Sequence, residues 1–200
     1  MSKQVAAAGG GGHEHAPQPQ PPAAYGAAAM TDLEGSINWS RCEILNTTKP
    51  GPHCVDSLLK QGYRDQEEML VESDADEQLL ITIDFQSKVK VHSISISAPA
   101  DGRAPKGLKL FVNKTTMDFS DAEGSAAEQE FELSEEQLGQ RIELKFVKFQ
   151  NVDRLTLFVS SNMGDEDVTA LSGIKLWGTG LAQTNMAEFK RVSGSAGEGE

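Results

Sequence analysis

RIELKFVKFQNVDRLTLFVS, at residues 141–160, is the part of this chain on which the predicted fold class most depends. Side chains alternate across a β-strand, so every second residue shares one face. Two runs in the stretch have this period, and their in-phase apolar residues are Ile142, Leu144, Phe146, Leu155, Leu157 and Val159. The pattern predicts two half-buried strands joined by a turn at residues 150–153.

The alternation slips within the first run. Val147 and Phe149 fall on the face that is polar before them, which predicts a bulge or sharp bend near Val147. Phe158 is also out of phase. Burying the six in-phase side chains at roughly 1.5–3 kcal/mol each gives on the order of 10 kcal/mol, comparable with the net stability of a domain. We therefore expect this pair to be central and a charge at Leu157 to unfold the protein.

Other segments repeat the strand pattern at residues 80–85, 88–98, 107–113, 130–133 and 171–178. In the second of these the apolar face switches between Val91 and Ile94, which predicts a bulge or a strand that passes between layers. Ser134-x-x-Gln137 and Asn185-x-x-Glu188 resemble capping boxes that open short helical turns. Many strands with little helix predict an all-β fold, an antiparallel β-sandwich or jelly roll.

Two segments lack a clear period. Residues 31–64 are irregular, and we expect them to pack along the core without strands of their own. Residues 114–129 form a long acidic connection containing Met117 and Phe119. These two side chains are expected to fold back onto the core, and an exposed anchor for a partner is the alternative.

Composition limits the organisation and the partners. With 200 residues, 38% of them hydrophobic, we expect one domain at 31–192 between disordered tails at 1–30 and 193–200. The net charge of -12 argues against nucleic acid and acidic membranes as partners. No run of 18 apolar residues and no signal segment is found, so the sequence predicts a soluble intracellular protein.

Candidate chemical groups are few. Cys42 and Cys54 are separated by eleven residues, which fits neither a C-x-x-C redox pair nor half of a zinc site. Two semi-buried thiols are the simpler interpretation, and a reversible disulfide is the alternative. His92 has no partner at catalytic spacing, and the acidic run at 72–77 fits a solvated turn better than a calcium loop. We expect no catalytic, cofactor-binding or metal-binding residues.

Four ordered motifs carry a resemblance to a known family: ESDADEQLLITIDF (72–85), MDFSDAE (117–123), FVKFQNVDRLTLFVSSN (146–162) and TNMAEFKRV (184–192). Together they resemble the PITH (proteasome-interacting thioredoxin) domain over residues 40–193. The resemblance implies a galactose-binding-like jelly roll and docking on the regulatory particle of the 26S proteasome. Two-domain members begin with a thioredoxin domain bearing Trp-Cys-Gly-Pro-Cys, which this sequence lacks, so oxidoreductase activity is not carried over. Cys42 and Cys54 stand where the family has cysteines, whereas Ala75 replaces one.

Three functions follow as hypotheses. The first is a non-enzymatic protein-interaction module, expected to be a monomer in the cytoplasm and also in the nucleus. Its suggested partner surface is the acidic loop Asp165, Glu166 and Asp167 with Phe189, Lys190 and Arg191, for each of which packing or solvation is the alternative. The second is a small-ligand or carbohydrate-binding jelly roll, by fold analogy. The third is a thiol redox sensor through Cys42 and Cys54.

Overall fold

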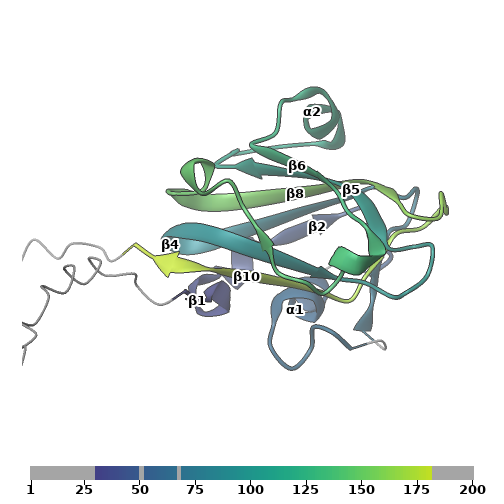
Figure 1. Ribbon diagram of the computed structural model, residues 1–200, viewed down its shortest axis with the longest axis horizontal. Coiled ribbons are helices and arrows are strands. Elements are labelled where there is room, and N and C mark those ends of the chain that lie inside the picture. Colours follow the sequence, from purple (N-terminus) through teal and green to yellow (C-terminus); the bar gives the residue numbers. More distant parts are fainter. Residues whose placement is uncertain (1–29, 50–51, 67–68, 182–200) are drawn as a thin grey trace, which may run out of the picture.

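Strands provide most of the regular structure in the computed structural model, which describes residues 30–49, 52–66 and 69–181 (Figure 1). The strands are β1 (Thr31–Asp32), β2 (Glu43–Leu45), β3 (Val71–Glu72), β4 (Leu79–Ser97), β5 (Pro105–Val112), β6 (Gln129–Glu132), β7 (Ile142–Glu143), β8 (Val152–Asn162), β9 (Ala170–Leu171) and β10 (Gly173–Gly180). The α-helices are α1 (Pro52–Leu59) and α2 (Phe119–Gly124). The 3-10 helices are η1 (Leu33–Ser36), η2 (Trp39–Arg41), η4 (Glu135–Gln137) and η5 (Phe146–Lys148).

The long strand β4 belongs to both layers of the fold. Its first half pairs with β2 and β8, and its second half pairs with β7 and β10. The pairing with β8 shifts register between Asp84 and Val89, where β4 passes from one layer to the other. The hydrogen-bonded order is β1-β10-β4-β8-β5-β6, and every pair among the described strands is antiparallel. The predicted all-β sandwich is confirmed, and Figure 1 shows β5, β6 and β8 above β4 and β10.

Two clusters of buried side chains hold the sandwich together. The main cluster contains the in-phase residues of β8, namely Leu155, Leu157 and Val159, together with residues from β4, β10 and α1. A smaller cluster on the other face contains Phe158 of β8 and Ala122 of α2. Figure 1 shows α2 over the outer side of β6, β5 and β8. The out-of-phase Phe158 is therefore buried because a helix covers the second face of β8.

Two predicted irregularities in the strands are confirmed. In the pairing of β4 with β10, Trp177 faces Ser93 and Gly178 faces Val91, so His92 is an extra residue on β4. This bulge lies in the interval where the apolar face switches, as predicted. The sharp bend predicted near Val147 is the 3-10 turn η5.

The expectation that residues 141–149 and 154–160 form two central strands is only half correct. β8 is central, because it lies between β4 and β5, but β7 is only two residues long and pairs with β4 instead. Phe146 was expected to be buried in phase with Ile142 and Leu144, yet its side chain is 46% exposed. β7 ends at Glu143 and the chain turns into η5 at Phe146, so Phe146 does not continue the buried face of a strand.

Three further expectations are corrected. Residues 31–64 were expected to contain no strand, yet β1 pairs with β10 and β2 pairs with β4. Residues 80–85 and 88–98 are one strand, β4. The acidic connection contains the helix α2, whose N-cap Asp118 forms a capping box with Asp121. Met117 and Phe119 pack against the smaller cluster, as predicted.

The capping box at Ser134 and Gln137 is confirmed and opens η4. The second predicted capping box, at Asn185, lies outside the described residues, as do most of the predicted N-terminal tail and all of the C-terminal tail. Among the residues that are described, no helix has the length and apolar character needed to span a bilayer.

Candidate interaction surface

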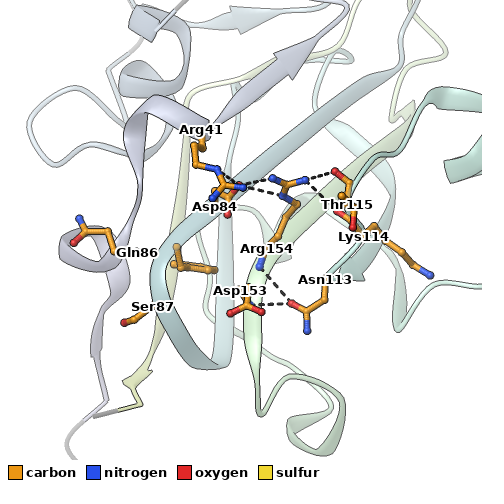
Figure 2. A pocket seen from close by; sticks show the side chains of 10 residues that line it. Arg41, Asp84, Gln86, Ser87, Asn113, Lys114, Thr115, Asp153 and Arg154 are labelled. Carbon is orange, nitrogen blue, oxygen red and sulfur yellow. Dashed lines mark hydrogen bonds and ion pairs between the residues drawn. The ribbon is translucent and has the colours of Figure 1, made fainter. Parts of the chain in front are cut away.

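A polar hollow of about 410 Å³ opens where β4, β8 and the loop after β5 meet (Figure 2). Asp84 lies at its base, 5% exposed, between the guanidinium groups of Arg154 and Arg41. Nε and Nη2 of Arg154 donate to Oδ2 of Asp84 at 3.1 and 2.5 Å, and Nε of Arg41 lies 3.3 Å from the same oxygen. Two guanidinium groups therefore share one buried carboxylate oxygen.

Arg154 also ties the loop after β5 to the sheet. Its Nη1 donates to the carbonyl oxygens of Lys114, at 3.3 Å, and of Thr115. Asp84 and Arg154 are register partners on neighbouring strands, so the ion pair spans the contact between β4 and β8. Because these hydrogen bonds occupy the Arg154 guanidinium, we assign it a structural role rather than ligand binding.

The two cysteines lie on different elements and are both free. Cys42 follows η2, where its Sγ accepts from the backbone nitrogen of Asp84 at 3.4 Å. Cys54 lies in α1, with its Sγ 3.5 Å from Oγ1 of Thr47. Burial raises the pKa of both thiols, which disfavours the reactive thiolate. The suggested redox pairing stays a prediction.

The acidic loop lies beside a second hollow, of about 420 Å³, which is lined in part by Glu166 and Asp167. Asn162 holds the loop: its Nδ2 donates to the Glu166 carbonyl oxygen at 2.7 Å, and its Oδ1 accepts from the Glu166 nitrogen at 2.8 Å. Asp165 adopts a left-handed backbone conformation with φ of 51°. The side chain of Asn162 thus organises the loop, and the role of the loop as a partner surface remains a prediction.

Arg103 is the cation of this second hollow. It bonds Glu72 at 2.5 Å and Asp101 at 2.9 Å. Hydrogen bonds from Arg103 hold the pKa of Asp101 below its ordinary value. Since Arg103 is already shared by two carboxylates, it does not offer a free positive charge to a ligand. The three other suggested surface residues, Phe189, Lys190 and Arg191, lie outside the described residues.

Sequence reasoning missed a third feature, which we call the basic–apolar tip: Lys145, Phe146, Val147 and Lys148. All four residues are exposed, and Val147 is 87% exposed. Only two other large hydrophobic residues among those described, Met30 and Tyr63, are also exposed. The tip thus places adjacent apolar side chains in water between two lysines. The sequence did contain a sign of this feature: a lysine stands on each side of Phe146 and Val147, where the alternation of apolar and polar residues breaks.

The described residues contain no group of three or more His, Cys, Asp or Glu side chains arranged to hold a metal ion. In the two hollows described above, the principal ion pairs, Asp84 with Arg154 and Glu72 with Arg103, are satisfied within the protein. The tip, by contrast, exposes apolar surface that the fold does not use.

Comparisons with known proteins agree with the sequence motifs. A family model described as "PITH domain" matches residues 23–194. Thioredoxin-like protein 1 of Schizosaccharomyces pombe is 37% identical over 170 residues, which is 82% of this chain and 56% of that protein. PITH domain-containing protein 1 of Homo sapiens is 33% identical over 157 residues, which is 78% of this chain and 70% of that protein. The chain therefore spans little more than half the length of the yeast relative.

Solved structures share the architecture at low sequence identity. The family 32 CBM from C. perfringens NanJ, in complex with galactose, has a TM-score of 0.53 and 8% identity, covering 74% of this chain and 98% of that one. The CBM32-1 and CBM32-2 domains of C. perfringens ZmpB, in complex with GalNAc, have a TM-score of 0.52 and 14% identity, covering 72% of this chain and 35% of that one. At such identity the likeness shows the galactose-binding-like fold alone.

Proposed function

Because the chain belongs to the PITH domain family, we propose that it is a non-enzymatic protein-interaction module that associates with the regulatory particle of the 26S proteasome. The proteasome is the partner that the family resemblance implies. Support from the geometry comes from one observation: Phe146 and Val147 are exposed side by side between two lysines. A protein that worked through a cleft would not need this surface.

The association is tested with purified components. The purified chain is mixed with 26S proteasome, with isolated regulatory particle or with the 20S core alone, and the mixtures are separated on native gels. We expect the chain to migrate with the 26S proteasome and with the regulatory particle, but not with the core. Failure to associate with any particle at low salt, or equal association with the core, contradicts the proposal.

The non-enzymatic part is tested separately. The raised pKa of both thiols leaves little thiolate to attack a disulfide. We therefore expect no reduction of insulin disulfides in the presence of dithiothreitol beyond the rate with dithiothreitol alone. A Cys42→Ser/Cys54→Ser variant is the matched control. Turnover that the wild-type chain shows and this variant lacks would identify a thiol enzyme.

A further inference from the structure

The basic–apolar tip differs in charge from the rest of the molecule. The chain carries 30 acidic residues, yet residues 144–152, LKFVKFQNV, contain none and include two lysines. Acidic residues flank this window directly: Glu143 belongs to β7, and Asp153 of β8 forms an ion pair with Lys88 at 3.9 Å. A molecule with a net charge of -12 therefore has a locally positive segment around two exposed apolar side chains.

The tip is held in place by contacts on both sides. Before it, the Leu144 nitrogen donates to the His92 carbonyl oxygen at 2.8 Å. After it, Phe149 is fully buried and its carbonyl oxygen accepts from the Val91 nitrogen at 2.9 Å. The Phe146 ring lies against His92, with centroids 5.7 Å apart. A fixed apolar group loses little conformational entropy on binding, which favours a role as an anchor.

Hydrogen bonds within the segment fix its shape. The Lys145 nitrogen donates to Oε1 of the buried Gln129 at 2.7 Å, and the Lys148 nitrogen donates to the Lys145 carbonyl oxygen at 2.8 Å. Nε2 of Gln150 donates to the Phe146 carbonyl oxygen, also at 2.8 Å. These bonds involve the backbone atoms of the tip and not its side chains. The side chains of Lys145, Val147 and Lys148 are exposed and are not needed to form the turn.

We propose that the basic–apolar tip docks on a protein surface that is acidic and carries an apolar pocket, an inference that rests on the proposed function. Val147 and the exposed part of Phe146 fill the pocket, while Lys145 and Lys148 face the surrounding carboxylates. At physiological salt the Debye length is about 8 Å. Carboxylates around the pocket therefore interact more strongly with the lysines of the tip than with the more distant acidic residues of the molecule. A flat anionic bilayer would also lie close to the acidic remainder of the molecule and repel it. The charge distribution therefore favours a protein partner over a membrane.

Two variants test the apolar and the charged parts. Phe146→Ala/Val147→Ser removes the anchor, and we expect the affinity for purified regulatory particle to fall at least about tenfold. Lys145→Glu/Lys148→Glu reverses the charge, and we expect a similar loss at low salt that shrinks as salt is raised. Tyr63→Ala is the matched control for an exposed aromatic residue, and Lys106→Glu is the control for charge. Both controls should bind like wild type.

The outcomes separate this inference from the proposed function. If the wild-type chain binds and the tip variants bind equally well, the tip inference is wrong and the proposed function stands. If the wild-type chain does not bind, both are wrong. Unfolding curves that match wild type exclude misfolding of the variants.

Two side experiments address other occupants. In one, the chain is sedimented with phosphatidylserine/phosphatidylcholine vesicles, and in the other its oligomeric state is measured by sedimentation equilibrium. Tip-dependent binding to the vesicles, or a dimer that the tip variants abolish, would replace the protein partner with a membrane or a second copy. The inference is supported if the tip variants match wild type in vesicle binding and in oligomeric state but bind the regulatory particle more weakly.

Discussion

Asp84 shares its buried carboxylate with two arginines that differ in exposure. The Arg154 side chain is 19% exposed, whereas that of Arg41 is 60% exposed. Removing Arg154 leaves the buried carboxylate with only the exposed Arg41 beside it, so we expect Arg154→Met to lower the free energy of unfolding by about 3 kcal/mol. Arg41→Met should cost less than about 1 kcal/mol. Urea unfolding compares the two, and equal losses would show that Asp84 does not depend mainly on Arg154.

The two thiols give a second prediction at the scale of single residues. Burial raises the pKa of Cys42 and of Cys54, so each has less thiolate at pH 8 than a free cysteine, whose pKa is about 8.5. Reaction with Ellman's reagent in the folded protein should be slower than for free cysteine and should speed up as the pH rises further. Reaction at the rate of free cysteine, or an oxidant-induced disulfide between them, would revive the redox-sensor hypothesis.

Between elements, the turn after α1 is joined to β10 through Asp65. Its nitrogen donates to the Ser172 carbonyl oxygen at 2.7 Å, and its carboxylate pairs with Lys175. Burial raises the pKa of Asp65, but hydrogen bonds from Lys175 and Ser97 and the nearby positive charges outweigh it, so the pKa is lowered. The stability that the carboxylate contributes is fully present above the ordinary Asp pKa, about 3.9. It is lost as the pH falls through the lowered pKa.

Asp65→Asn tests this linkage without disturbing the backbone, because Asn also tolerates the φ of 68° found there. We expect the variant to be less stable than wild type at pH 7, with a gap that narrows as the pH falls below about 3.9. Glu136→Gln, an exposed residue of η4, is the control. A gap that is constant from pH 7 to pH 2.5, measured by urea unfolding, would contradict the assignment.

Elements with strict alternation were predictable, and elements defined by distant partners were not. Leu155, Leu157 and Val159 mark β8 because its core face has an unbroken period of two. β2 is three residues long, too short to show a period, and exists because Ile44 pairs with Ile81 of β4. The segment before η5 has the same period, but its strand ends at Glu143 and the chain turns into η5 at Phe146, which a sequence pattern alone does not reveal.

At the scale of the whole molecule, Leu157 occupies the middle of the sandwich. It is fully buried and lies opposite Ile81 of β4 and Leu110 of β5. An unpaired carboxylate there has no partner and no water, so we expect Leu157→Asp to abolish the cooperative unfolding transition followed by near-UV circular dichroism. Asp153→Ala, at an exposed position of the same strand, should keep it. A cooperative transition in Leu157→Asp would show that β8 is not central.

For the candidate sites, as for the strands, only features formed by neighbouring residues in the sequence could be predicted. The acidic loop around Glu166 was visible in the sequence as a local run of charges, and the structure places it beside a hollow. The ion pair of Asp84 with Arg154 joins residues 70 positions apart, so no local pattern could indicate it. The exposure of Phe146 and Val147 was likewise hidden, because exposure depends on which strands lie nearby.

Hydrogen exchange of the chain, alone and bound to purified regulatory particle, tests the central claim most directly. The tip lies outside the strands and is exposed, so its hydrogen-bonded amides should open and exchange faster in the free protein than the amides of the buried strands. We predict that binding slows exchange in peptides covering residues 144–150 and leaves peptides around Asp84 in the polar hollow unchanged. Unchanged exchange at residues 144–150, with protection confined to the acidic loop or the polar hollow, would contradict the account.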